Sequence, residues 1–140
     1  MERISTAIKS SEESHSGEIV FVVEGALPFR YIFKSSTPRQ RAVDLFSEHR
    51  VWDTAHNSGV LIYLLLSERD IEIVADRGVA SAISDEDFKK LVSIIELQSK
   101  RGAMVDGVIE TIGALSDRLS QVAPKGTGDI NEIRNRPILL

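Results

Sequence analysis

The sequence predicts an α/β protein in which helices flank a small mixed β-sheet. Residues 18–24, 60–66 and 70–76 have the β-branched and apolar content of strands, whereas the segments around them repeat apolar residues every three or four positions, as helices do. A strand, a helix and a second strand in succession normally form parallel neighbours joined by a right-handed crossover. The order helix, strand, helix, strand, strand, helix, helix therefore predicts one mixed sheet with helices around it.

Composition limits the classes of function. A chain of 140 residues is long enough for one domain with a substantial core, and its 42% hydrophobic content is ordinary for a globular protein. A formal net charge of -4, without a run of Lys and Arg, argues against a nucleic-acid partner. The absence of cysteine excludes disulfides and thiolate zinc sites and is consistent with a cytoplasmic protein. We also expect the protein to be a monomer.

Neither a leader nor a membrane span is expected from the sequence. The first fourteen residues contain acids and alternate polar with apolar side chains, unlike a signal peptide. The longest apolar run, residues 60–66, is about a third of the length that a membrane-spanning helix requires.

The first half of the chain predicts a helix, a strand and a second helix. Ile4, Ala7 and Ile8 line one side of a short first helix, and Gly17 separates it from the strand at 18–24. After a connection at 25–36, Thr37-Pro38-Arg39-Gln40 combines an N-cap, a first-turn proline and a capping-box glutamine. These signals predict a helix over 38–49, with Ala42, Leu45 and Phe46 on its apolar face.

The middle of the chain predicts an antiparallel hairpin. Residues 60–66 lack polar alternation, as expected of a strand that is buried on both faces. Residues 70–76 alternate, which places the second strand nearer an edge of the sheet.

Two amphipathic helices and a tail complete the prediction. Ser84 is expected to cap a helix that ends at Gly102, and a last helix follows. The apolar stripes of these two helices are Phe88, Leu91, Val92 and Ile95, and Val105, Val108, Ile112, Leu115 and Leu119. Residues 123–140 contain Gly, Pro and mixed charge without a period, so we expect one domain over 1–122 and a flexible C-terminal tail.

The parallel arrangement predicts a cluster of polar side chains at one edge of the sheet. Strands 18–24 and 60–66 would start at the same edge, and the hairpin would return the end of the third strand to it. The candidate metal ligands at this edge are His15, Asp53, His56, Asn57 and Asp76, with Arg77 as a candidate anion-binding residue. The oxygen donors suit calcium or magnesium, whereas ligation by the two histidines would favour zinc or manganese.

Each of these residues also has a structural interpretation. His15 is a common kind of residue at a helix end, and Asp76 and Arg77 can form ion pairs with neighbours. Trp52 can hold its loop against the core or stack on a ligand.

Three features of the chain occur together: the loop that ends in residues 57–62 (NSGVLI), the hairpin of 67–78 that ends in a glycine, and the helix join carrying Gly102 and Gly107. In this combination the chain resembles the TPM domain family. The resemblance covers roughly residues 15–120 and is closest to short bacterial members. It implies a three-layer α/β/α sandwich. The family includes a plant thylakoid-lumen protein with acid phosphatase activity, calcium-binding members and membrane-tethered accessory proteins.

Two functions are therefore expected as alternatives. The first is an accessory module that binds a divalent metal or a protein partner without catalysis. The second is a metal-assisted phosphatase, in which Asp53, His56 and Asp76 would hold the metal and Arg77 would neutralise the phosphate. The accessory module ranks first because the sequence contains no P-loop, dinucleotide fingerprint, Gly-x-Ser-x-Gly elbow or His-Glu-x-x-His motif, and no nucleophile with an adjacent base. Whether the protein is an enzyme stays open on the sequence alone.

Overall fold

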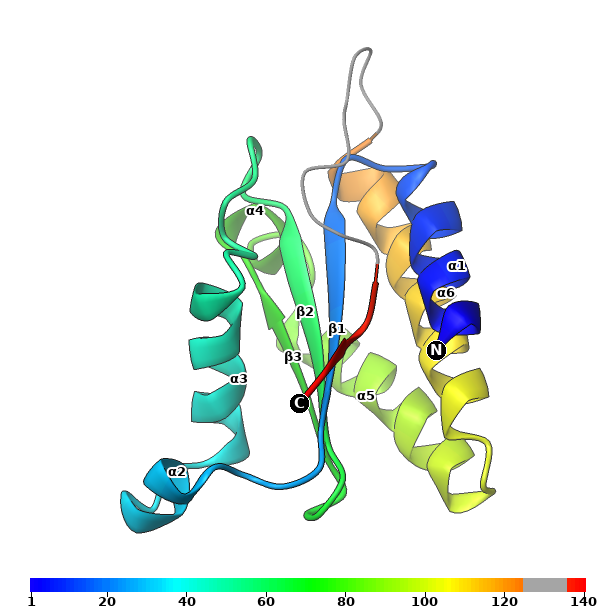
Figure 1. The fold of residues 1–140 in the computed structure, drawn as a ribbon. Helices are drawn as coiled ribbons and strands as arrows, with labels where there is room; N and C mark the ends of the chain where they lie inside the picture. Colours follow the sequence, from blue (N-terminus) through cyan, green and yellow to red (C-terminus); the bar gives the residue numbers. More distant parts are fainter. Residues whose placement is uncertain (125–135) are drawn as a thin grey trace.

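A four-stranded mixed sheet lies between two layers of helices (Figure 1). The structure is a computed structural model, and it describes residues 1–124 and 136–140. The strands are β1 (Glu18–Glu24), β2 (Gly59–Leu65), β3 (Asp70–Ala75) and β4 (Ile138–Leu139), in the spatial order β3-β2-β1-β4. The main helices are α1 (Glu2–Glu12), α3 (Pro38–Glu48), α5 (Asp85–Lys100) and α6 (Met104–Val122). The three-layer α/β/α class that the resemblance implies is confirmed.

Strand pairing agrees with the expectation from the sequence. β1 and β2 are parallel in the register Glu18↔Gly59 to Glu24↔Leu65, and β2 and β3 are antiparallel from Val60↔Ala75 to Leu65↔Asp70. All seven residues of β2 are buried, whereas β3 alternates at the sheet edge. The two faces of β2 are covered because helices pack on both sides of the sheet.

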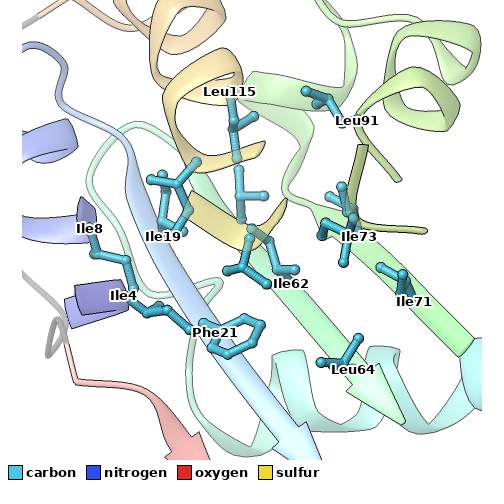
Figure 2. Close-up of a cluster of buried hydrophobic side chains, with 14 of the residues drawn as sticks. Ile4, Ile8, Ile19, Phe21, Ile62, Leu64, Ile71, Ile73, Leu91 and Leu115 are labelled. Carbon is cyan, nitrogen blue, oxygen red and sulfur yellow. The ribbon is translucent and has the colours of Figure 1, made fainter. Parts of the chain in front are cut away.

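The core has one part on each face of the sheet. Helices α1, α5 and α6 cover the face to which β1 contributes Ile19 and Phe21 and β2 contributes Ile62 and Leu64 (Figure 2). Helix α3 covers the opposite face, where Leu45 packs with Val20, Val22 and Leu61. Alternating residues of β1 and β2 thus enter different cores, so the lack of polar alternation in both strands has a direct structural cause.

The helix boundaries follow local capping chemistry. The Thr37 hydroxyl accepts a hydrogen bond from the Gln40 backbone N–H, and the Gln40 Oε1 accepts one from the Thr37 backbone N–H, which makes the predicted capping box. The Ser84 hydroxyl caps α5 by accepting from the Asp87 N–H. Gly102 follows α5 with a φ of +73°, a conformation that glycine adopts without strain.

Two short helices and one strand were not predicted. Helix α2 (Phe29–Phe33) lies in the expected connection, and α4 (Arg77–Ala80) replaces the glycine turn expected after the third strand. Both have at most five residues, which is too short for a visible helical period.

The expectation of a flexible C-terminal tail needs correction at its end. Ile138 and Leu139 form β4, which pairs in parallel with Val22 and Val23 of β1. A strand of two residues is too short to show a periodic pattern in the sequence. Ile138 and Leu139 form a strand because the side of β1 that faces away from β2 offers backbone groups with which they can pair. The rest of that expectation falls partly on residues 125–135, which lie outside the described residues.

Candidate functional site

The segments expected to share one edge of the sheet do meet there. β1 and β2 both start at this end, and the Glu18 backbone N–H donates to the carbonyl of Ser58 over 3.1 Å. The Asp76 N–H donates to the Gly59 carbonyl over 2.9 Å, so the residues after β3 lie beside the start of β2. Helix α4 and the loop of residues 49–58 lie together at this end in Figure 1, which we call the strand-start edge.

Asp76 is the most enclosed carboxylate of the predicted set. One of its oxygens, Oδ1, accepts a hydrogen bond of 2.7 Å from the Arg77 backbone N–H and so caps α4. The other, Oδ2, is buried and accepts no hydrogen bond from the described residues. A buried carboxylate oxygen without a donor is costly, so Asp76 is the member of the predicted set with the clearest need for a further partner.

Backbone carbonyl groups surround Gly78, close to Asp76. The Gly78 N–H donates to the Asn57 carbonyl over 2.9 Å. A β-carbon added at Gly78 would lie 2.5 Å from the His56 carbonyl oxygen and 2.6 Å from that of Asn57. The close approach of α4 to the 49–58 loop therefore requires glycine, and it brings two carbonyl oxygens against α4 at Gly78, two residues after Asp76.

The other predicted ligands lie on the rim of this edge or inside the protein. Asp53 is 53% exposed and forms an ion pair of 2.7 Å with Arg50. His56 and Asn57 are also exposed, and Asn57 adopts a φ of +51°. His15, in contrast, is fully buried, and its Nε2 lies 2.8 Å from the Ser11 hydroxyl. The two histidines therefore occupy different environments.

A pocket of about 270 Å³ opens at the same edge. Ser16, His56, Ser58 and Gly78 line it together with residues 122–124 at the end of α6. His56 is the one predicted ligand that lines this pocket. Among residues 1–124 and 136–140, no group of three or more His, Cys, Asp or Glu side chains is arranged to hold a metal ion. The donor set that the edge does offer consists mainly of oxygens, from the Asp76 carboxylate and the loop carbonyls, which suits calcium or magnesium.

Trp52 packs against its own chain segment. Its indole N–H donates to the carbonyl of Ser47 at the end of α3, over 3.2 Å. The Arg50 guanidinium lies 5.5 Å from the centroid of the Trp52 ring, although Trp52 remains 47% exposed. These contacts agree with the interpretation that Trp52 holds the loop in place.

Sequence reasoning missed a buried polar network at the opposite end of the sheet. Arg41 of α3 donates two hydrogen bonds of 2.8 Å to the Glu24 carboxylate, and the Tyr63 hydroxyl donates a third of 2.7 Å. Burial alone would raise the pKa of Glu24, but the hydrogen bonds from Arg41 and Tyr63 and the Arg41 charge lower it below its usual value. Glu24 at the end of an apolar strand and Arg41 next to Ala42 in the apolar stripe were the available signals.

Two neighbouring acidic residues, Asp70 and Glu72, lie on the edge strand β3. The pKa of Glu72 is raised to about 7, mainly by burial and then by the hydrogen bond and negative charge of Asp70, which outweigh the lowering by Arg39. The Arg39 guanidinium lies 3.7 Å from the Glu72 carboxylate and donates to the Ile73 carbonyl over 2.6 Å. Arg39 thereby occupies one of the outward backbone groups of β3 and protects this sheet edge.

Comparison with known proteins identifies relatives of the whole domain. A family model described as the TPM domain matches residues 1–118. The NMR structure of BA42 protein from the psychrophilic bacterium Bizionia argentinensis is similar at 27% identity, with a TM-score of 0.87 over 99% of this chain and 91% of that one. The N-terminal domain of a P. gingivalis protein shares the fold at 16% identity, with a TM-score of 0.67 over 83% and 71% of the two chains. Among curated proteins, no match was found.

Proposed function

This chain belongs to the TPM domain family, and from that premise we propose that it is an accessory module that binds a divalent cation at the strand-start edge. The observation that supports this proposal most strongly is the Asp76 carboxylate. Its Oδ2 is buried and accepts no hydrogen bond from the described residues, while Oδ1 is engaged in capping α4. A cation would satisfy an oxygen that otherwise loses its hydration without compensation.

The proposed ligands are oxygens. Asp76 would supply the charge, the carbonyl groups of His56 and Asn57 around Gly78 would supply neutral donors, and Asp53 lies on the exposed rim. Such a set favours calcium or magnesium. Zinc or manganese ligation by two histidines has less support, since the His15 ring is buried and lies within hydrogen-bond distance of Ser11. When bound, the ion would supply positive charge that holds the loop against α4.

A thermal melt of metal-stripped protein tests this proposal. An ion that binds only the folded state raises stability by mass action, by about 2.7 kcal/mol at one hundred times its dissociation constant. For a chain of 140 residues that corresponds to an upward shift in Tm of about 8–10 °C. We expect a saturable shift with calcium or magnesium and a smaller one with zinc.

Asp76→Asn is the informative variant because asparagine is also a good N-cap, so the substitution removes charge while the cap of α4 can remain. We expect it to abolish the calcium shift. Asp106→Asn is the matched control, because Asp106 is an exposed aspartate that forms an ion pair of 2.6 Å with Arg3 at the start of α6. An equal shift in wild type and Asp76→Asn, or no shift with any ion, would contradict the proposed site.

The metal-assisted phosphatase is the alternative function. It would use Asp53, His56 and Asp76 as ligands and Arg77 to neutralise the phosphate. It has less support because it requires three side-chain ligands, and no group of three or more His, Cys, Asp or Glu side chains is arranged to hold a metal ion in the described part of the chain. Metal-dependent hydrolysis of a phosphate monoester that is lost in Asp76→Asn and retained in Asp106→Asn would favour it over the accessory role.

The accessory role also implies a protein partner. We propose that this protein is a monomer in the cytoplasm when it binds the partner; both expectations, the monomeric state and the compartment, rest on composition. Size-exclusion chromatography of the pure protein and cell fractionation test the two parts of this statement. In the described residues, no helix is both long and apolar enough to cross a membrane.

A further inference from the structure

The end of the molecule opposite the proposed metal site has an unusual concentration of exposed apolar side chains. This is the end at which β1 and β2 finish, and it carries α2 and the β2–β3 turn (Figure 1). Ten large hydrophobic side chains are exposed among the described residues, and six of them belong to α2, the residue after β2, or β4 and the C-terminus. These six are Phe29, Ile32, Phe33, Leu66, Leu139 and Leu140.

Helix α2 presents the strongest part of this surface. Phe29, Ile32 and Phe33 are 77%, 55% and 84% exposed, and their i, i+3, i+4 spacing places them on one side of a single helical turn. The rings of Phe29 and Phe33 lie 6.3 Å apart and form a continuous apolar tip. We call these three side chains the α2 tip. On the other side of the turn, Tyr31 is buried and anchors the helix through its hydroxyl, which donates to Asp44 over 2.5 Å.

The chain segment that carries α2 is positively charged, although the chain as a whole is negative and Asp44 and Glu48 of α3 lie beside this segment. Residues 25–43 contain no Asp or Glu but four cations, in a chain with a formal net charge of -4. The charge of Arg41 is neutralised by its buried ion pair with Glu24, and the other three cations are Arg30, Lys34 and Arg39. The Arg30 side chain is 60% exposed, and its ion pair with Glu48 is long, at 3.7 Å. Arg30 and Lys34 thus flank the apolar tip with cations.

We propose that the α2 tip docks on the surface of an anionic lipid bilayer, with Phe29, Ile32 and Phe33 in the headgroup–acyl boundary and Arg30 and Lys34 at the lipid phosphates. Aromatic and aliphatic side chains beside Lys or Arg suit this interface, where one part of a surface is apolar and the other is charged. The association is peripheral, because a five-residue helix spans only a small part of the hydrocarbon layer.

The size and shape of the tip favour a lipid surface over a folded protein. A stable protein interface buries on the order of 800 Å² on each partner, whereas three exposed side chains on one helical turn supply only a few hundred. A protein partner would also need a complementary concave surface. A bilayer adapts to a small convex tip and needs no such match, and its negative surface complements Arg30 and Lys34.

Vesicle binding tests this proposal with the complete chain. We expect co-sedimentation with phosphatidylcholine vesicles that contain about a third phosphatidylserine, little binding to pure phosphatidylcholine, and weakening by added salt. Phe29→Ser combined with Phe33→Ser should lower the partition coefficient at least about tenfold, because two apolar side chains lose their transfer to lipid. Val43→Ser is the matched control, since Val43 is 44% exposed on α3, and it should bind as wild type does.

A fluorescence measurement locates the inserted surface. The chain has one tryptophan, Trp52, which follows α3 at the opposite end of the sheet. In the double variant Phe33→Trp, Trp52→Phe, emission should shift to shorter wavelength on adding anionic vesicles, whereas emission from Trp52 in the wild type should not. Absence of wild-type binding to anionic vesicles, or full binding by the double serine variant, would overturn the proposal. Since the substituted side chains are exposed, thermal melts of all variants should match wild type.

Discussion

The buried Glu24–Arg41 pair makes a quantitative prediction about stability. Both side chains are 6% exposed, and Arg41 donates two hydrogen bonds of 2.8 Å to the carboxylate. Arg41→Met would leave a charged carboxylate in the core with the Tyr63 hydroxyl as its remaining donor in this network. Breaking a buried pair by removing one partner costs about 3–5 kcal/mol. That is a large fraction of the roughly 5–15 kcal/mol by which a domain of this kind is stable.

The second substitution separates the buried charge from lost packing. Adding Glu24→Gln to Arg41→Met should recover about 1–3 kcal/mol, because the buried group becomes neutral and its amide oxygen still accepts from Tyr63. Arg39→Met is the control on the same helix, where the side chain is 53% exposed, and it should cost less than about 1 kcal/mol. Urea denaturation at pH 7 measures all three variants. A loss in Arg41→Met no larger than in Arg39→Met, or further destabilisation by Glu24→Gln, would refute the reasoning.

The pH dependence of these variants has a defined sign. The lowered pKa of Glu24 in the wild type means that the pair contributes stability above the usual carboxylate range and loses it as pH falls through the folded pKa. In Arg41→Met, burial without the guanidinium should raise the pKa of Glu24 above its usual value, so unfolding free energy should instead fall as pH rises. Between about pH 4.5 and 7 the unfolding free energy should therefore fall more steeply in Arg41→Met than in the wild type, where Glu72 already lowers it. Equal slopes in the two proteins would contradict this account.

Three further predictions concern single positions. Glu72→Gln should stabilise the protein at pH 8 and not at pH 4. The pKa of about 7 means that the folded state keeps a proton which the unfolded state has lost, so wild-type stability falls between roughly pH 4.5 and 7, by about 1–2 kcal/mol. Urea titrations at both pH values check this, and the same dependence of stability on pH in the variant and the wild type would contradict it. Gly78→Ala should cost about 2–4 kcal/mol, because the new β-carbon would lie 2.5 Å from the His56 carbonyl oxygen, whereas Gly25→Ala meets nothing within 4 Å and should lie within about 1 kcal/mol of wild type in thermal melts. Thr37→Ala removes the capping box of α3 and should cost about 1 kcal/mol by urea denaturation, and Thr37→Ser should restore most of it; equal stability of the two Thr37 variants would mean that the cap contributes nothing.

The candidate site was only partly predictable from the sequence. Asp53, His56 and Asp76 could be expected at one edge of the sheet because strand direction follows from the order of the elements. Which of them turn inward depends on local backbone geometry. Asp76 is enclosed because it caps α4, and Asp53 stays on the rim with Arg50. Neither fact has a periodic signal in the sequence.

The α2 tip and the buried pair show why tertiary structure is needed. Phe29 and Phe33 look like core residues by type, and only the placement of α2 leaves them exposed. Conversely, Arg41 and Glu24 look like surface residues by type, and only the packing of α3 on β1 and β2 brings them together in the interior.

By itself the sequence determined the elements with a period or a cap: the strands expected at 18–24, 60–66 and 70–76, the helix expected at 38–49, the helix between Ser84 and Gly102 and the last helix, and the parallel and antiparallel pairings between the strands. The elements depend on interactions between residues that are close along the chain, so the sequence displays them, and the pairings follow from the order of the elements. Tertiary structure alone decided the pairing of Ile138–Leu139 with β1, the burial of Oδ2 of Asp76 and the exposure of the α2 tip. Each depends on which surfaces distant segments cover, and this is set by packing over the whole domain.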